Sequence, residues 1–523
     1  MIATSQSLAS AAGLKVLQDG GNAIDAIVTA AAVLAVVEPS MNGIGGDLLA
    51  IVHDAKTGKI YGLDSTGRSA HGATPAEFAK RGITAMPAKG PLTVDVPGVV
   101  EGWHQLLTRF GTISLATALA PAIGYARDGF PVAELVAAEW SNNEAQLAAD
   151  PATAATFLPD GTPPRHGDLF ANPRLAHSLD VIGRDGRDAF YVGSIAHAIV
   201  ADLKARGGLL DARDFAEHTS EWVEPIGTTY RGVDILEMPP STQGFVALEM
   251  LNIMEGFDLQ SMGHNSADYL HVVAEAKRIA FADRGAYLAD RGHMPKGVLE
   301  TLISKEYASA RRREIDMTRA AAAPAPGTVP GIPVPDYWGQ DLGDTVYLTA
   351  ADAHGNVVSC IQSLFASFGA GFVAGDTGIT LQNRGSGFNL RPGHANQIGP
   401  RKRPMHTLVP AMLVKAGKPW VAFGVMGGDN QAQAHAQIVA NLVDFGMHVQ
   451  EAGDAARMRH LGVSLALESG VGPDVREALA ARGHIVVDGR GLMGGYQAVI
   501  VDPGTGALLG GSDHRKDGLA IGW

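Results

Sequence analysis

Two apolar stretches at the start of the chain predict a pair of helices. Residues 5–18 place apolar side chains at helical spacing and end at Asp19-Gly20-Gly21, a stop that is typical of helix C-termini. Residues 23–37 are almost entirely apolar and follow Asn22, which can cap a helix. This second stretch is shorter than a membrane span and carries Asp25, so we expect a buried core helix.

The pattern changes along the chain from helix-rich to strand-rich. Residues from about 100 to 320 have mainly helical periodicity, and residues 319–343, rich in alanine and proline, predict a linker. Beyond the linker, we expect strands at 345–351, 356–363, 420–425, 485–488 and 497–501, and helices at 432–445 and 474–482.

The composition describes a folded, glycine-rich chain. Of its 523 residues 46% are apolar and 65 are glycine, which excludes wholesale disorder. The net charge of −13, without a long basic run, argues against a nucleic-acid partner. One cysteine excludes an internal disulfide and a cysteine-based zinc site, and no histidine pair has an acidic companion at ligand spacing. We expect no metal and no cofactor.

The N-terminus gives little information on the compartment. Met1 to Ser5 lacks the charged region, apolar stretch and cleavage site of a signal peptide. This favours a cytoplasmic protein with no membrane partner. A periplasmic or secreted location stays open if a segment before Met1 was removed, so the compartment is left unknown.

The junction between linker and strand is the first candidate for chemistry, because the chain has no GxSxG elbow and no Walker loop. Asp344-Thr345 opens a predicted strand directly after the linker. If the chain cleaved itself there, Thr345 would gain a free α-amino group, with a pKa of about 7.7–8.0, as its own general base. The alternative is an ordinary threonine at a strand start, and the Asp-Thr pair alone favours that alternative.

Ten sequence motifs, in a fixed order along the chain, shift the preference from an ordinary threonine to self-cleavage. They are GGNAIDA (20–26), VVEPSMNGIGGD (36–47), DVPGVVEGW (95–103), ARDGF (126–130), YRGVDILEMPPSTQG (230–244), AFADRGAYLAD (280–290), GDTVYLTAADAHGNVVS (343–359), FGAGFVAGDTGITLQN (368–383), GPRKRPMHTLVPAM (399–412) and GVMGGDNQAQAH (424–435). With these motifs the chain resembles the γ-glutamyltransferase (γ-glutamyl transpeptidase) family of N-terminal-nucleophile hydrolases over nearly its full length.

The resemblance implies an α+β fold, a four-layer αββα sandwich made as a precursor. Cleavage between Asp344 and Thr345 would give a large subunit, 1–344, ending in the linker, and a small subunit, 345–523, within one globular unit.

The resemblance also implies catalytic roles. Thr345 is the implied nucleophile, and Ser363 stands where the family has a second threonine hydroxyl. Gly427 and Gly428 match the glycine pair whose amides form the oxyanion hole. Those glycines can equally form a strand-to-helix turn, and both interpretations can hold together.

The acyl-binding positions depart from the family pattern. The departures are Pro75 at the position counted as the family arginine, Phe365 for asparagine, Arg384 for glutamine, Gly387 for aspartate, and His406 and Thr407 for two serines. An added guanidinium and a lost carboxylate do not suit the zwitterionic end of glutamate. We therefore expect altered acyl specificity.

In this hypothesis Arg384, His406 and Thr407 hold an acidic or polar acyl group. Arg68 is a second carboxylate candidate, although a surface ion pair is favoured for it. A structural, hydrogen-bonded role for His406 is an equal alternative.

Several functions remain open at this point. The first is an autoprocessing γ-glutamyltransferase-like enzyme that transfers the acyl group of a small-molecule amide to water or to an amino-acid or peptide acceptor. The second is an acylase or amidohydrolase resembling cephalosporin acylase or oxamate amidohydrolase. The third is an unprocessed, inactive binding homologue. The sequence decides neither between hydrolysis and transpeptidation nor whether the protein is a homo-oligomer.

Overall fold

The structure is a computed structural model of the chain, and it describes residues 1–321, 323–332 and 344–523. Of the predicted linker 319–343, residue 322 and residues 333–343 lie outside the described residues.

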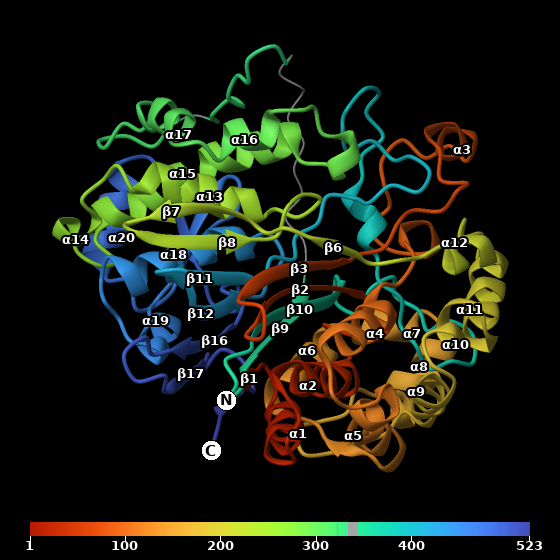
Figure 1. Cartoon of the computed structure of the whole chain (residues 1–523). Coiled ribbons are helices and arrows are strands. Elements are labelled where there is room, and N and C mark those ends of the chain that lie inside the picture. Colours follow the sequence, from red (N-terminus) through yellow and green to blue (C-terminus); the bar gives the residue numbers. More distant parts are fainter. Residues whose placement is uncertain (322, 333–343) are drawn as a thin grey trace.

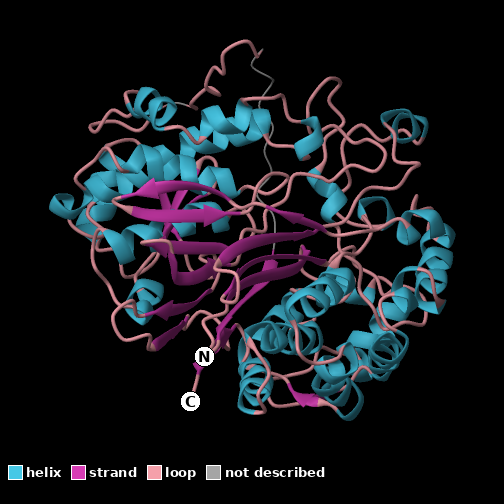
Figure 2. Cartoon of the chain, viewed as in Figure 1, coloured by secondary structure: helices cyan, strands magenta, loops and turns pink. Residues whose placement is uncertain are grey.

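Two antiparallel sheets face each other at the centre of the molecule (Figures 1 and 2). The first has the strand order β18 (Leu519–Ile521), β1 (Ile2–Thr4), β9 (Asp344–Ala351), β10 (Val357–Phe365), β2 (Asp47–Asp54), β3 (Lys59–Ser65), β6 (Glu221–Val223). The second has the order β17 (Leu508–Ser512), β16 (Tyr496–Val501), β12 (Lys418–Val425), β11 (Ala411–Lys415), β8 (Val233–Glu237), β7 (Ile226–Tyr230). Smaller sheets join β13 (Met458–His460), β14 (Ser464–Leu467) and β15 (Ile485–Asp488), and β4 (Phe130–Pro131) and β5 (Leu169–Phe170).

Each central strand buries both of its faces. On β10, Val357 and Ile361 belong to the apolar layer between the two sheets, whereas Val358 and Cys360 face the helices. This period of two is the geometry of a strand, and burial on both sides explains the continuous apolar run in the sequence.

Helices cover the outer face of each sheet. The seven-stranded sheet shares an apolar core with α1 (Ser7–Gln18), α2 (Ala23–Val37), α3 (Pro75–Lys80), α4 (Val99–Phe110), α5 (Leu115–Asp128), α6 (Glu134–Asn142), α7 (Glu144–Ala148), α8 (Pro151–Phe157), α9 (Pro173–Asp185), α10 (Asp188–Tyr191), α11 (Ser194–Ala205) and α12 (Ala212–Ala216). The six-stranded sheet shares another core with α13 (Gly244–Met254), α14 (Leu259–Met262), α15 (Ala267–Tyr287), α16 (Val298–Leu302), α17 (Lys305–Arg312), α18 (Asn430–Val443), α19 (Val449–Asp454) and α20 (Pro473–Ala481). The predicted four-layer αββα sandwich is confirmed.

Most predicted elements are present, with one correction. Residues 100–320 were expected to be mainly helical, but they also contribute β6, β7 and β8, and β8 pairs with β11. These strands are only three to five residues long, so their period of two is too brief to stand out among helices.

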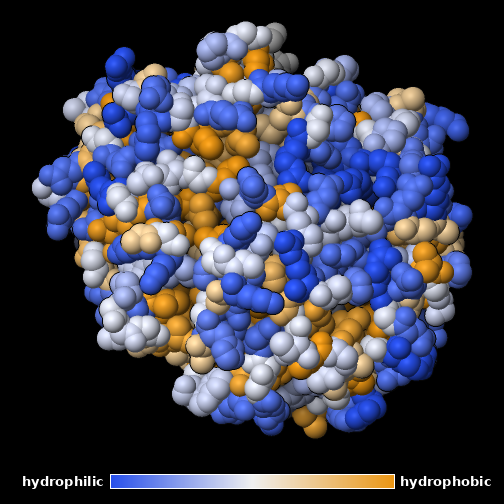
Figure 3. Space-filling view, in the orientation of Figure 1, coloured by the Kyte–Doolittle hydropathy of each residue, from blue (hydrophilic) through white to orange (hydrophobic). Residues whose placement is uncertain are grey.

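The molecular surface is polar and apolar in different regions. Figure 3 shows polar residues gathered over the loop-rich upper right of the view, and apolar residues more frequent on the left, over the six-stranded sheet and its helices. None of the helices in the described ranges is long and apolar enough to cross a membrane.

Helix α2 is the buried core helix that its composition predicts. All of its residues are buried, and Asn22 caps it through the amides of Ile24 and Asp25. The carboxylate of Asp25, itself fully buried, accepts hydrogen bonds from the backbone amide of Asn22 at 2.9 Å and from the amide and hydroxyl of Thr112 at 2.8 and 2.5 Å. Asp25 therefore ties the start of α2 to the loop between α4 and α5.

We expect Asp25→Ala to lower the free energy of unfolding by about 1–3 kcal/mol, because it removes the charged acceptor that the Asn22 amide and the Thr112 amide and hydroxyl share. Asp19→Ala is the matched control, since Asp19 is exposed and pairs only with Lys15 on the surface of α1. Chemical denaturation of both variants measures the difference. An equal effect of the two substitutions would contradict the role assigned to Asp25.

Candidate active site

Thr345 lies near the start of β9, in the middle of the seven-stranded sheet, and is buried. Its hydroxyl donates to the Ser363 hydroxyl across a 3.4 Å separation between the two oxygens. The register of β10 against β9 shifts between Gln362 and Phe365, and Phe365 has a φ of +81°. A phenylalanine in this region is strained. The shift lets the Phe365 amide donate to Ser363 Oγ at 2.7 Å, which fixes that hydroxyl beside Thr345.

Gly427 and Gly428 join the end of β12 to the start of α18. Their φ values of +114° and +60° suit glycine, so the turn interpretation is correct. Within the described residues neither backbone N–H donates a hydrogen bond, which leaves both available to a ligand. A hollow of about 300 Å³ borders Gly427.

A buried ion pair anchors this turn. Arg284 on α15 holds Asp429 with two hydrogen bonds of 2.6 and 2.8 Å, and it also donates to Gln243 Oε1 at 2.7 Å. Gln243 in turn donates to the carbonyls of Thr407, at 2.8 Å, and Gly428, at 3.0 Å. None of these three side chains stands out in the sequence, although all lie within the quoted motifs.

Arg384 is also buried, and Phe365 connects it to Ser363. It begins a short 3₁₀ turn, Arg384–Gly387. Its Nη1 donates to Thr407 Oγ1 at 2.9 Å, and its guanidinium stacks 4.0 Å above the Phe365 ring. Nε lies 3.8 Å from Asp47 Oδ2, beyond hydrogen-bond distance. In the part of the chain that the structure describes, Nε and Nη2 have no hydrogen-bond partner, so Arg384 presents an unused pair of donors.

The charges of Arg384 and of the carboxyl groups near it, Asp47 and Asp95, nearly balance. Asp47 accepts a hydrogen bond from the Gly67 amide at 2.8 Å and faces Arg384. Burial lowers the pKa of Arg384 to about 10 against the opposing effect of Asp47 and Asp95, which still leaves a full cation at neutral pH. Burial, reinforced by the neighbouring charge of Asp47, raises the pKa of Asp95 well above its ordinary range. Asp47 and Asp95 were also missed from the sequence.

His406 is a structural neighbour of this group. Its Nδ1 accepts from the Leu408 amide at 3.3 Å, so the ring proton is on Nε2, which lies 3.2 Å from Asp47 Oδ2. Burial, and then the positive charge of Arg384, lowers the pKa of His406 to about 4. The ring is therefore neutral at pH 7 and donates to Asp47, which agrees with the hydrogen-bonded alternative.

Most of the predicted site residues meet in one closed ring of contacts. Starting at Thr345, the contacts run through Ser363, Phe365, Arg384, Thr407, Gln243, Gly428 and Gln431, and Gln431 returns to Thr345. Asp344 begins β9 opposite Phe365, so the predicted cleavage junction also lies at the ring.

Gly427 and His406 are not members of this ring but precede Gly428 and Thr407 in the sequence, and Arg68 and Pro75 also lie outside it. Arg68 is ion-paired with Glu221, which also binds Arg403, so the ion-pair alternative for Arg68 is correct. Pro75 is exposed at the first turn of α3, at the upper right of Figure 1, so it is no evidence about acyl specificity.

Gly387 has a steric reason to lack a side chain. A Cβ built there would lie 2.9 Å from the Met405 carbonyl oxygen. An aspartate would require the segment before His406 to move, so the missing carboxylate follows from close backbone packing as well as from pocket chemistry.

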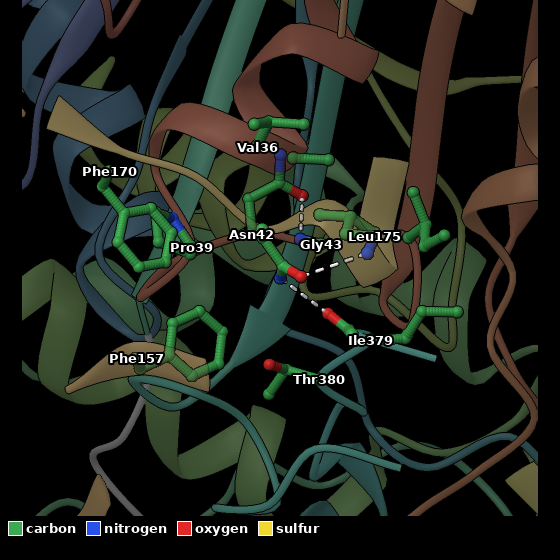
Figure 4. A pocket seen from close by; sticks show the side chains of 13 residues that line it. Val36, Pro39, Asn42, Gly43, Phe157, Phe170, Leu175, Ile379 and Thr380 are labelled. Carbon is green, nitrogen blue, oxygen red and sulfur yellow. Dashed lines mark hydrogen bonds between the residues drawn. The ribbon is translucent and has the colours of Figure 1, made fainter. Parts of the chain in front are cut away.

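Other polar clusters and cavities lie apart from the ring. Figure 4 shows a cavity of about 20 Å³ lined by Asn42, Gly43, Phe157 and Phe170, which is too small for a substrate. Asp454, Asp513 and His514 bring possible metal-ligand atoms within 4.8 Å of one another among the described residues. Asp513, however, is paired with Arg457 and Arg515.

Two facing antiparallel sheets between helical layers are the architecture of a hydrolase of the N-terminal-nucleophile type. The chain belongs to the γ-glutamyltranspeptidase family, whose model matches residues 9–523.

Known relatives support this assignment. The chain is 39% identical over 532 residues to the glutathione hydrolase-like YwrD proenzyme of Bacillus subtilis (strain 168), covering 100% of this chain and 98% of that protein. It is 38% identical over 531 residues to the acylase ACY 1 proenzyme of Pseudomonas sp. (strain SE83), covering 100% and 93%. The crystal structure of cephalosporin acylase from Bacillus halodurans matches with a TM-score of 0.93 at 39% identity, covering 100% and 95%. The family expected from the motifs is confirmed.

The lowered pKa of His406 gives a pH prediction. The unfolded chain binds this proton near pH 6.5 and the native chain only near pH 4, so acidification through this window favours unfolding. The stabilising contribution is fully present above pH 6.5 and is lost as the pH falls to 4. We expect His406→Gln to reduce the acid-induced loss of unfolding free energy by roughly 2–4 kcal/mol.

Denaturation curves between pH 4 and 7 measure this difference. His166→Gln is the control because His166 is exposed. An unchanged acid sensitivity in His406→Gln would contradict the neutral, buried state of the ring.

Proposed function

We propose that Thr345 is the nucleophile of an autoprocessing amide hydrolase. The observation that carries this proposal is the placement of its hydroxyl, 3.4 Å from Ser363 Oγ and linked through Gln431 to the Gly427–Gly428 turn. In the precursor, Thr345 Oγ1 attacks the Asp344 carbonyl carbon, and the C–N bond breaks to give an ester and a free amine. Water then hydrolyses the ester, which leaves an Asp344 carboxylate and an N-terminal threonine.

Turnover uses the same atoms. The freed α-amine, with an ordinary pKa of about 7.7–8.0, takes the hydroxyl proton while Oγ1 attacks the substrate amide. The amides of Gly427 and Gly428 donate to the oxyanion, and the leaving amine departs with the proton. Water or an amine acceptor then removes the acyl group from Thr345. Hydrolysis and transfer differ only in this last step.

The acyl group that fits best carries oxygen acceptors and no ammonium. Arg384 presents Nε and Nη2, the two donors that bind a carboxylate side-on, and both are unused within the described residues. An ammonium placed there would meet the Arg384 cation. Arg384 and Thr407 therefore support acylase-like specificity for a glutaryl-like or similarly polar acyl group, while His406 acts indirectly through Asp47.

Of the two alternatives, one has specific support. A glutathione hydrolase-like preference is favoured by Asp47 and Asp95, whose carboxyl groups could receive an ammonium. An inactive binding homologue is disfavoured because Thr345, Ser363 and the glycine pair converge.

We expect the purified chain to run on a denaturing gel as two bands of 344 and 179 residues, since 523 − 344 = 179. Thr345→Ala removes the nucleophilic oxygen and should leave one band of 54.4 kDa without activity, whereas Thr345→Ser should still cleave. Mass spectrometry of the small fragment locates its first residue. Cleavage of Thr345→Ala, or a parent chain that stays intact on incubation, would refute the assignment.

Acyl specificity is tested with two substrates that differ only in the ammonium, glutaryl- and γ-glutamyl-p-nitroanilide. We expect at least about tenfold higher kcat/KM for the glutaryl substrate. Arg384→Lys keeps the positive charge facing Asp47 but loses the planar pair of guanidinium donors. It should lower kcat/KM for the glutaryl substrate by about 10- to 100-fold while self-cleavage continues.

Arg68→Lys is the matched control, because Arg68 is engaged by Glu221, and it should leave the substrate ratio unchanged. A preference for the γ-glutamyl substrate that Arg384→Lys does not alter would contradict the altered-pocket proposal.

A further inference from the structure

Gln431 lies beside the nucleophile without a role in the chemistry described so far. It is the second residue of α18, three positions after Gly428, and is fully buried. Its backbone amide donates to the Gly428 carbonyl at 3.1 Å, and its side-chain Nε2 donates to Thr345 Oγ1 at 3.3 Å. In a third contact, the Val409 amide donates to Oε1 at 2.9 Å.

The orientation of this side chain is settled by Val409. A backbone N–H can only donate, so the atom of Gln431 that faces it must be the amide oxygen. The amide nitrogen, which is a donor only, must then face Thr345 Oγ1. Because Oγ1 accepts a hydrogen bond from Gln431, its own O–H points elsewhere, and Ser363 Oγ, 3.4 Å away, accepts a hydrogen bond from it.

We infer that Gln431 is a catalytic hydrogen-bond donor to the oxygen of the nucleophile. This inference rests on the proposed role of Thr345. It adds a donor for Oγ1, separate from the glycine amides that would serve the carbonyl oxygen.

Negative charge develops on Oγ1 at two points. It appears when the hydroxyl proton is removed for attack, and again when water attacks the acyl carbon, the C–Oγ1 bond breaks and its electron pair returns to Oγ1. Gln431 keeps its protons throughout and stabilises the charge on this oxygen. An ester oxygen is a weak acceptor, so the hydrogen bond is stronger in the transition state than in the acyl-enzyme, which is the condition for accelerating deacylation.

The decisive variant is Gln431→Glu. A carboxylate still accepts from Val409 but cannot donate to Oγ1, so we expect both self-cleavage and turnover to fall by about 100-fold at pH 8. On acidification the carboxyl group protonates and regains a donor, so the ratio of variant to parent rates should rise toward pH 5. A purely structural role for Gln431 would not produce this pH-dependent recovery.

Gln431→Met supplies the second test and decides the question if the glutamate variant does not fold. Methionine fills a similar volume without a donor, so the rates should fall by about 10- to 100-fold with a ratio to the parent that does not change with pH. Gln437→Glu and Gln437→Met are the matched controls, since Gln437 is buried on the same helix and donates to Met458 and Gln433 instead of Thr345. Thermal denaturation reports on folding in each case.

The outcomes separate this inference from the proposed function. If the parent cleaves and Thr345→Ala does not, but Gln431→Met stays within about threefold of the parent in both steps, the role of Gln431 is overturned. If the parent itself neither cleaves nor turns over an amide, the proposed function fails first.

Discussion

The pairing of β9 with β10 is the constraint on which the rest of the site depends. Their antiparallel register sets Thr345 beside Ser363, and the irregularity after Gln362 turns Phe365 out of the regular strand. The same turn places the Phe365 ring beneath the Arg384 guanidinium. A one-residue slip in a strand moves each side chain to the opposite face, so this register decides whether the Thr345 hydroxyl belongs to the ring of contacts at all.

The two sheets are also what make the proposed cleavage compatible with a stable fold. β9 lies between β1 and β10, and β10 pairs with β2, so strands from before and after residue 344 pair with one another in one sheet. Breaking one peptide bond leaves these ladders intact. The glycine turn has its own anchor, because the Arg284–Asp429 pair is bidentate and buried, and removing either partner would leave an uncompensated charge.

Local sequence patterns predicted the elements better than the site. α2 and β10 were predictable because their burial shows within one window of sequence. β7 and β8 are short, and β8 depends on pairing with β11, far along the chain, while β7 pairs with β8. Thr345, Ser363 and the glycine pair were found through the family resemblance. Asp47, Asp95 and Gln431 were missed, because their importance comes from contacts with distant residues that no local pattern records.

The electrostatics of Arg384 follow from that same non-local packing. Taken alone, Arg384 adds a cation and Gly387 removes an anion, which suggests a strongly positive pocket. The structure instead sets Asp47 between Arg384 and a neutral His406, and burial favours a protonated Asp95. Net charge is therefore a weak guide to what the pocket accepts. Directional hydrogen bonding is a better one, because a buried guanidinium with two unused donors gains most from a group that supplies two oxygens in its plane.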